Sequence, residues 1–368
     1  MSHPPPAASR ILVVRNDKLG DFMLAWPALA TLKQADSSLH ISVLVPHYTA
    51  AMAAACPWVD EVMIDPGDKA ERREQNDLLA RMKASRFDAV LTLFSTPRIG
   101  SLCWRAGIVL RIAPATKWAQ VFYNVRIRQR RSRSEKPEYQ YNVELAQVLL
   151  KYLGKSDAPS AQPPFWPLDA ATVNQTRTRL LATIQNAGPR AHDATSTNTA
   201  RQLIVIHPGS GGSAVNLTLD QYATLAHQIQ QQIDTQPDTR AGWLISAGPG
   251  EEAQAAELCQ TLQADGLTAA LLPASANVVE FGHSLASADL LIAGSTGPLH
   301  MAGCLNIATA GFYPAKRSAT ALRWQTCNAA GKRLAFSPPP NTHAQDMSAV
   351  DIPTAARSIA ALLMLDSP

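Results

Sequence analysis

A carboxylate stands at the first junction between a strand-like and a helix-like run of the sequence. The run Ile11–Val14 is apolar, a second apolar run begins at Phe22, and Gly20 and Asp21 lie between them. Glycine allows a close turn, so Asp21 is presented at the end of the strand. There it can take a proton from a hydroxyl nucleophile as a general base, or cap the following helix, since Asp is a favoured N-cap. Lys18 and the helix N-terminus favour the ionised form that a base requires.

A second candidate site is the glycine-rich turn IAGSTGPLHMAG, residues 292 to 303. Its strand is expected to end at Ala293, and Pro298 suits the first position of a helix. Free backbone amides at a helix N-terminus form a ready site for a diphosphate, with a histidine as an extra donor. The residues expected to bind this anion are Ser295, Thr296, Gly297, Pro298, Leu299 and His300. From spacing alone, an ordinary Gly-Pro loop with an exposed histidine is an equal alternative.

Two further turns follow strand-like runs in the second half of the chain. HPGSGGSAVN, residues 207 to 216, contains Ser210 and Gly211, whose small side chains and free amides suit an anion nest. SAGPGEE, residues 246 to 252, places Glu251 where it can meet ribose hydroxyls. The plainer interpretations are a flexible surface loop for the first turn and acidic charge favouring a helix N-terminus for the second.

Positive charge concentrates between residues 117 and 136, where the one acid is Glu135. The cations of this stretch are Lys117, Arg126, Arg128, Arg130, Arg131, Arg133 and Lys136. Because like charges repel, this density favours a polyanionic partner, and a solvated basic loop is the alternative. No nucleic-acid-binding motif accompanies the charge, so nucleic acid is not the expected partner.

Missing motifs exclude several common kinds of site. No GxGxxG follows the first strand, and no Walker A motif, zinc-ligand cluster, GxSxG elbow or Asp-X-Asp pair occurs. A diphosphate site in this chain would therefore use backbone amides and cationic side chains instead of a metal, and no cofactor is expected.

The composition is that of a folded globular protein, with 368 residues, 46% of them hydrophobic and 17% charged, and a formal net charge of +4. Five scattered cysteines without metal-ligand spacing favour a reducing compartment. The N-terminal stretch MSHPPPAASR lacks the apolar core of a signal peptide. No run approaches the roughly 20 apolar residues of a membrane span. A cytoplasmic protein is expected, with contact to a membrane surface left open.

Alternation of strand-like and helix-like runs predicts an α/β protein with two doubly wound domains. Strands are expected at 11–14, 41–45, 61–64 and 88–93, with helices at 22–34, 48–55, 71–84, 142–153 and 170–187. A second α/β series starts at Leu203. The expected divisions are a domain over 1–157, a linker with a helix and a polar loop over 158–200, a domain over 201–350 and a C-terminal helix over 351–368. In such sheets ligands bind beyond the carboxyl ends of the strands, where all the turns named above lie.

These segments, in their order, resemble the ADP-heptose:lipopolysaccharide heptosyltransferase family. RILVVRNDKLGDFMLAWPAL is similar to the family's opening strand, Gly-Asp turn and helix, and YNVELAQVLLKYLG to the segment before its inter-domain linker. HPGSGGSAVN, SAGPGEE, AGSTGPLHMAG and RWQTC are similar to its second-domain motifs. The resemblance implies a GT-B fold, in which two Rossmann-like domains face a cleft that holds the active site.

The resemblance also implies an activity. It implies inverting transfer of a heptose from ADP-heptose to the inner core of lipopolysaccharide, without a metal. The implied partners are the nucleotide sugar and a lipid A-core acceptor, met at the inner face of the inner membrane. By position, Asp21 after Gly20 matches the catalytic aspartate, and Glu251 lies where the family contacts the nucleoside. The residues that match the donor diphosphate motif are Thr296, Gly297, Leu299 and His300. The residues expected to meet the anionic acceptor are Lys18, Arg126, Arg128, Arg130 and Arg131.

The chain departs from the family pattern at three places. Val215 stands where many members carry a basic residue after GGSA, so another cation, such as Lys18, would have to meet the donor phosphate. Ser295 stands where some members carry Asp, and CLNIAT replaces a more usual Gly-X-Pro pattern. Two alternatives therefore stay open: a glycosyltransferase of the same fold with another nucleotide sugar or acceptor, and a non-catalytic two-domain sugar-binding protein.

Overall fold

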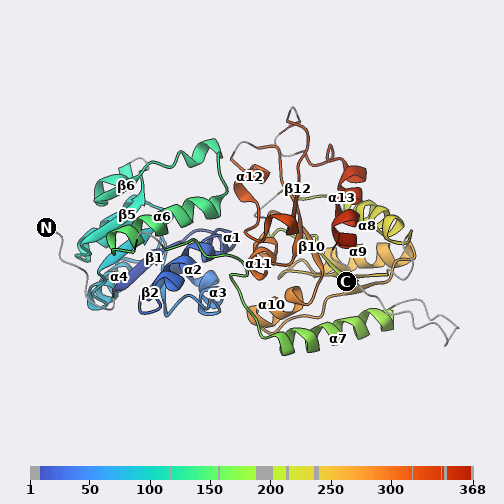
Figure 1. The fold of residues 1–368 in the computed structure, drawn as a ribbon, viewed down its shortest axis with the longest axis horizontal. Helices are drawn as coiled ribbons and strands as arrows, with labels where there is room; N and C mark the ends of the chain where they lie inside the picture. Colours follow the sequence, from blue (N-terminus) through green and yellow to red (C-terminus); the bar gives the residue numbers. More distant parts are fainter. Residues whose placement is uncertain are drawn as a thin grey trace. The chain divides into compact units, whose positions relative to one another are not determined.

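The computed structural model divides the chain into two compact units, Met1–Trp166 and Pro167–Pro368 (Figure 1). Each unit is described by itself. The residues that the structure describes are 9–115, 118–155, 158–187, 202–212, 215–235, 240–316, 318–340, 342–343 and 346–365. The polar loop predicted between residue 188 and the second strand series lies outside them, and so does Lys117.

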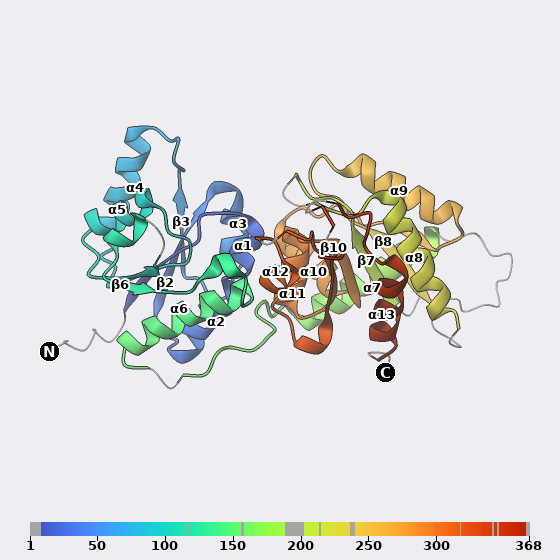
Figure 2. The same ribbon diagram turned by 90° about the horizontal axis from the view of Figure 1, so that it is seen from above.

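The described part of the first unit forms a six-stranded parallel sheet in the order β3-β2-β1-β4-β5-β6. Its strands are β1 Arg10–Val14, β2 His40–Pro46, β3 Glu61–Asp65, β4 Ala89–Thr92, β5 Leu110–Pro114 and β6 Val125–Ile127. Its helices are α1 Leu19–Met23, α2 Trp26–Ala35, α3 Ala50–Ala54, α4 Arg72–Ala84, α5 Pro97–Arg105 and α6 Glu138–Tyr152, with short 3-10 turns η1 His47–Thr49, η2 Trp118–Phe122 and η3 Arg131–Arg133. Figure 2 shows α4 and α5 on one side of this sheet and α2 and α6 on the other.

The second unit repeats this plan. Its described residues form a six-stranded sheet in the order β12-β11-β10-β7-β8-β9. Its strands are β7 Gln202–His207, β8 Ala241–Ile245, β9 Ala269–Leu271, β10 Leu290–Gly294, β11 Ala308–Phe312 and β12 Arg333–Phe336. Its helices are α7 Ala170–Ala187, α8 Leu219–Ile233, α9 Glu252–Ala264, α10 Val278–Ala286, α11 Gly297–Leu305, α12 Ala321–Trp324 and α13 Ile352–Leu365, with a 3-10 turn η4 Ala330–Lys332.

The central strands explain why both sheets are covered on two faces. β1 and β7 are continuous apolar runs whose residues are almost all buried, as parallel strands between two helix layers require. In the second unit, α8 packs against both α9 and α13, while α10 packs against α7 and α11. Counted from its own first strand, each sheet has the order 3-2-1-4-5-6, which reverses between its first and fourth strands. Ligands of such sheets bind at that reversal, here beyond β1 and β4 or beyond β7 and β10.

The helix predicted at 22–34 differs in the structure. It is two helices, α1 and α2, and the first begins three residues earlier than predicted, at Leu19. Leu24 and Ala25 separate them, and Pro27 occupies the first turn of α2, where a missing N–H costs no hydrogen bond. The helix expected at 142–153 corresponds to α6, and Gly154 follows it with a φ of +76°, a conformation that glycine adopts without strain.

Candidate active site

Asp21 lies in the first turn of α1, the helix that follows β1 after the connecting residues 15–18. Lys18 holds the N-cap position of this helix and makes no side-chain capping bond, so the alternative role of Asp21 as the cap is wrong. Asp21 instead accepts a hydrogen bond from Arg15 Nη2 at 2.7 Å, and its side chain is 13% exposed. A carboxylate that is largely buried yet still reaches solvent keeps one oxygen available to a reacting group.

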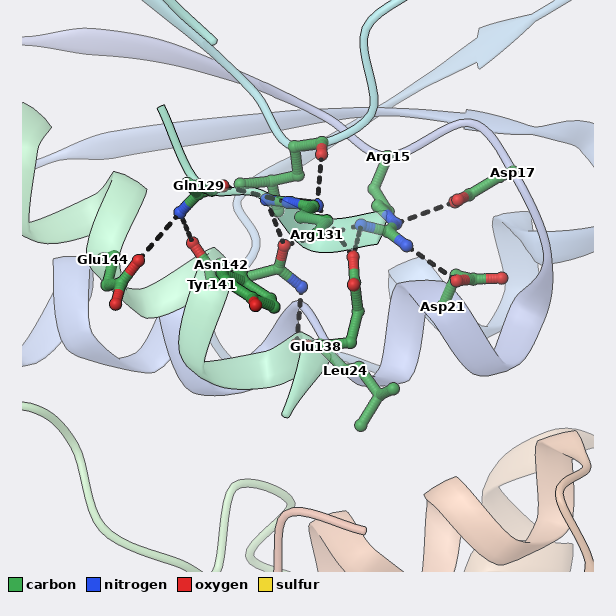
Figure 3. Close-up of polar contacts among 11 residues, drawn as sticks. Arg15, Asp17, Asp21, Leu24, Gln129, Arg131, Glu138, Tyr141, Asn142 and Glu144 are labelled. Carbon is green, nitrogen blue, oxygen red and sulfur yellow. Dashed lines mark hydrogen bonds and ion pairs between the residues drawn. The ribbon is translucent and has the colours of Figure 1, made fainter. Parts of the chain in front are cut away.

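Arg15 is the centre of this site, and three carboxylates surround its guanidinium (Figure 3). Its Nε donates to Asp17 at 2.8 Å, its Nη2 to Asp21 at 2.7 Å and its Nη1 to Glu138 at 3.0 Å. The arginine side chain is only 2% exposed. A buried charge needs such partners, because desolvation of an unpaired ion costs several kcal/mol.

The same arrangement sets the protonation of the cluster. Burial opposes the charge of Arg15, but Asp17, Asp21 and Glu138 outweigh it and raise the pKa of the guanidinium. Burial raises the pKa of Asp17 to about 6, and the neighbouring charge of Asp21 adds to this rise while Arg15 opposes it. Asp17 therefore titrates close to neutral pH, as a second carboxylate beside the proposed base.

Helix α6 supplies the far side of the cluster. Glu138 is 1% exposed and accepts hydrogen bonds from both Arg15 and Arg131, the latter at 2.7 Å. Asn142, one turn later, donates from Nδ2 to the carbonyl of Leu24 at 2.9 Å and so ties α6 to the segment between α1 and α2. Sequence reasoning missed Arg15, Glu138 and Asn142. Their signal in the sequence is weak, because Glu138 lies just beyond the basic stretch and 123 residues from Arg15.

The basic residues of the predicted acceptor site divide into two groups. Arg131 turns inward: its Nη1 also donates to the Leu93 carbonyl at 2.9 Å, and its guanidinium lies 5.5 Å from the centroid of the Tyr141 ring. The second group is exposed and consists of the other residues predicted to meet the acceptor, Lys18, Arg126, Arg128 and Arg130. Part of the charge density that suggested a polyanionic partner thus serves the internal cluster, since Arg131 neutralises Glu138.

In the second unit, Glu251 joins two glycine-rich turns. It holds the N-cap position of α9, and its carboxylate accepts hydrogen bonds from the backbone amides of Gly211 at 2.6 Å and Gly248 at 2.9 Å. His207 Nε2 lies 3.6 Å from the same carboxylate. Burial lowers the pKa of His207, against the charge of Glu251, so the imidazole is neutral near pH 7. Glu251, expected at the ribose, is at present engaged by the main chain of both turns.

Asn216 fills the reversal point of the second sheet, between the ends of β7 and β10. Its Nδ2 donates to the Pro208 carbonyl at 2.7 Å, and its Oδ1 accepts from the buried hydroxyl of Tyr222 at 2.5 Å. A Cβ on Gly294 would lie 2.6 Å from that Oδ1, so only glycine fits beside it. Val215 packs against the hydrophobic core and contributes no charge to this turn.

The turn after β10 differs from its prediction in two details. Helix α11 begins at Gly297, with Pro298 second, and the Thr296 amide is not free because it donates to the Gly294 carbonyl at 2.8 Å. Gly297 and Leu299 lie in the first helical turn, where amides have no intrahelical acceptor. Ser295, like Ser210 in the turn after β7, is partly exposed. The backbone of this turn therefore retains part of the predicted anion site.

His300 is buried rather than exposed, at 3% accessibility. Burial lowers its pKa to about 4, so the imidazole is neutral at physiological pH and can donate only one N–H at a time. Its Nδ1 and the hydroxyl of Thr296 are buried without a hydrogen-bond partner among the described residues. Buried polar atoms without partners are uncommon in folded proteins, which makes these two atoms candidates for a ligand contact.

Comparison with a known sequence identifies the family. Over 338 residues the chain is 42% identical to a Haemophilus influenzae protein whose name assigns it provisionally to the glycosyltransferases, and the match covers 91% of each protein. The chain belongs to this glycosyltransferase family. No family model matches the chain.

Solved structures share the fold of this glycosyltransferase. Escherichia coli ADP-heptose lipopolysaccharide heptosyltransferase II has a TM-score of 0.70 at 16% identity, covering 97% of this chain and 99% of its own. A family 9 glycosyl transferase of Veillonella parvula also has a TM-score of 0.70, at 14% identity, covering 97% and 98%. An E. coli heptosyltransferase with ADP has a TM-score of 0.66 at 16% identity, covering 96% and 99%. The predicted GT-B fold, with its two Rossmann-like units, is confirmed.

Proposed function

We propose that this glycosyltransferase moves a heptose from ADP-heptose to the inner core of lipopolysaccharide, with inversion and with Asp21 as the general base. The observation that carries the proposal is the placement of Asp21 beyond β1, fixed by the buried guanidinium of Arg15. One E. coli heptosyltransferase of the same fold has structures both with ADP and with ADP-2-deoxy-2-fluoro heptose, which supports the choice of donor.

The proposed reaction is a single displacement. An acceptor hydroxyl attacks the anomeric carbon of the heptose as its proton passes to a carboxylate oxygen of Asp21, and ADP leaves from the opposite side with the bonding electron pair. A positioned base typically contributes about 10²–10⁴-fold to such a step. Arg15 holds one carboxylate oxygen at 2.7 Å, which orients the other oxygen toward the acceptor.

The donor diphosphate is proposed to bind at the first turn of α11. The amides of Gly297 and Leu299, the hydroxyl of Thr296 and the neutral imidazole of His300 would supply its hydrogen bonds. Ser210, Gly211 and Ser295 would lie around the phosphates, and Glu251 would meet the ribose after releasing one of its backbone amides. No metal is assigned a role in this scheme, and no cofactor is proposed.

The acceptor is proposed to be anionic lipid A-core, met through the exposed cations Lys18, Arg126, Arg128 and Arg130. Phosphates and carboxylates of such an acceptor would form ion pairs with them. The proposed location is the cytoplasmic face of the inner membrane. Among the described residues, no helix combines the length and apolar character needed to cross a membrane.

A second candidate is transfer of a different sugar by the same mechanism. Val215 favours it, because a partly buried apolar side chain packs against the core at the position where a donor-phosphate cation is usual in the resembled family. In both candidates Asp21 and the turn of α11 keep their roles.

The test combines two measurements. The purified chain is incubated with heptose-deficient lipopolysaccharide and one of three donors, ADP-heptose, ADP-glucose or UDP-glucose. The masses of the products are then measured by mass spectrometry. Lipopolysaccharide from a deletion strain is analysed in parallel. The proposal is supported if the purified chain adds a heptose and the deletion strain's lipopolysaccharide lacks one. Addition of a hexose would establish the second candidate. Both candidates would be overturned if no donor is used and the lipopolysaccharide of the deletion strain is unchanged.

A further inference from the structure

Four large apolar side chains are exposed around α5 and η2 in the first unit. Their exposed fractions are 59% for Trp104, 76% for Val109, 84% for Trp118 and 65% for Val121. Single exposed apolar residues are ordinary on a protein surface, whereas a group that includes two tryptophans indicates a binding surface.

Contacts show that the segments carrying these side chains lie in one region. A Cβ on Gly100 of α5 would lie 2.9 Å from the Phe122 side chain, so this face of α5 meets η2. Trp104 follows Gly100 by four residues and therefore stands on the same face of the helix. Val109 is tied to the same place, because its carbonyl accepts a hydrogen bond from Asn124 Nδ2 at 2.7 Å, two residues after η2 ends.

The register of the sheet brings cations to this region. Val90 of β4 packs in the core under α5 and pairs with Arg111 of β5. Residues paired in a parallel sheet point to the same face, as do alternate residues of a strand. Ala113, two residues after Arg111, pairs with Arg126. Arg126 therefore points to the α5 side of the sheet.

Arg128, two residues beyond Arg126 and past the last residue of β6, continues this alternation with an exposed side chain. Arg105 ends α5 beside Trp104 and is exposed. Among the described residues, none of these three arginines has an acidic partner. We call the surface formed by Trp104, Arg105, Val109, Trp118, Val121, Arg126 and Arg128 the α5–η2 face. Cations on the edge strand β6 would also discourage strand pairing, but that role does not explain the exposed tryptophans.

We propose that the α5–η2 face docks on an anionic lipid bilayer. Tryptophan rings settle at the headgroup level of a membrane, and arginines with no acidic partner are attracted to anionic headgroups. Tryptophan and arginine are also enriched in protein interfaces, so a protein partner is the alternative that the vesicle experiment separates from a bilayer. The inference rests on the proposed function, to which it adds the surface that would bring the enzyme to a lipid-linked acceptor.

The test is sedimentation of the full chain with vesicles, with no sugar nucleotide or acceptor present. Vesicles of phosphatidylcholine alone are compared with equal parts phosphatidylcholine and phosphatidylglycerol, at low and high salt. The wild-type chain is expected to prefer anionic vesicles and to lose affinity in salt. Arg126→Gln with Arg128→Gln should weaken binding by about fivefold per arginine. Trp118→Ala with Val121→Ser should weaken it by about tenfold or more.

Matched controls lie elsewhere on the chain. Arg72→Gln with Arg73→Gln removes the same charge from the exposed start of α4, and Leu322→Ser removes an exposed apolar side chain from α12. Both should bind vesicles as the wild-type chain does. Trp118→Ala with Val121→Ser should keep its melting temperature and its turnover on a deacylated, water-soluble acceptor.

Three outcomes would overturn the proposal. The first is a wild-type chain that ignores anionic vesicles, and the second is an equal loss in the control variants. The third is that the wild-type chain forms a dimer, and that Trp118→Ala with Val121→Ser abolishes the dimer but leaves vesicle binding unchanged. If the chain binds vesicles through this face but transfers no sugar, the docking surface is established and the proposed reaction is refuted.

Discussion

The two sheets have the same strand order, yet their reversal points carry opposite chemistry. Beyond β1, the site is made of ionised side chains, with one buried guanidinium among three carboxylates. Beyond β7 and β10, it is made of glycines, backbone amides and buried neutral histidines, together with the carboxylate of Glu251. The two sheets share one plan, and the side chains at their strand ends differ: in the proposed function the first site moves a proton and the second holds an anion.

The largest effect is expected from Asp21→Asn, which keeps the shape of the side chain but cannot accept a proton. Turnover should fall by about two orders of magnitude or more, while ADP affinity stays near the wild-type value because the donor turn is untouched. Turnover, ADP binding by calorimetry and melting temperature are to be measured on one preparation.

Near-normal turnover with a lower melting temperature would make Asp21 a structural partner of Arg15. The base would then be sought in Asp17, whose pKa is about 6. In that case the rate should rise with pH through about 6 and disappear in Asp17→Asn.

Glu138→Gln tests whether the first site depends on buried charge. It removes the carboxylate shared by Arg15 and Arg131, and breaking a buried ion pair typically costs about 3–5 kcal/mol. The free energy of unfolding should drop toward that range in a denaturant titration. Glu135→Gln is the matched control, since its carboxylate is 51% exposed and lies 3.7 Å from Arg133, and it should change stability by about 0–1 kcal/mol. Equal effects of the two changes would refute the role assigned to the cluster.

The two sites should also respond oppositely to pH. His300 has a pKa of about 4 in the folded chain against 6.5 when unfolded. Between these values the unfolded state binds more protons, so stability is full above pH 6.5 and falls as the pH falls toward 4. Asp17 has a folded pKa of about 6 against 3.8, so there the folded state binds more protons. The stability that protonated Asp17 contributes to the folded chain is present below pH 3.8 and is lost as the pH rises through 6.

Each pKa shift of this size corresponds to about 3 kcal/mol of unfolding free energy. His300→Gln should abolish the loss of stability in acid, and Asp17→Asn should abolish the opposing loss toward neutral pH. Melting temperatures of both variants and the wild-type chain between pH 4 and pH 7 check this. A His300→Gln profile parallel to the wild-type profile would mean that folding does not lower the pKa of His300.

A smaller effect is expected from Gly209→Ala in the second site. The added methyl group would overlap the Glu251 carboxylate and push it away from the glycine turns. Overpacking of this kind typically costs about 1–3 kcal/mol. Gly331→Ala is the control, because nothing lies near the Cβ it would add. Equal melting temperatures for the two variants would show that Glu251 moves freely and does not fix these turns.

Much of the fold could be predicted from the sequence, because the buried strands are continuous apolar runs. The predicted strands correspond to β1 to β4, whereas β5 and β6 carry Arg111 and Arg126 and have no apolar run to reveal them. Charged side chains on these outer strands hide the strand signal. A single helix was expected where α1 and α2 stand, although Pro27, inside the expected span, is a sequence signal for a helix start.

The first site could be predicted only in part. The position of Asp21 followed from a local pattern, a strand followed by Gly-Asp. Its partners did not, because Arg15 meets Glu138 through the packing of α6 on the sheet, and spacing in the sequence carries no trace of that contact. The burial of His300 was missed for the same reason, since a helix N-terminus is exposed only if nothing packs over it.

The place of Asn216 between β7 and β10 has an evolutionary consequence. Its amide occupies the space that a side chain at Gly294 would need, so the two positions cannot change independently. A homologue with alanine at 294 is expected to carry a smaller residue at 216 and to lack the hydroxyl of Tyr222, which would otherwise lose its acceptor. The residues at positions 216, 222 and 294 should therefore change together across the family.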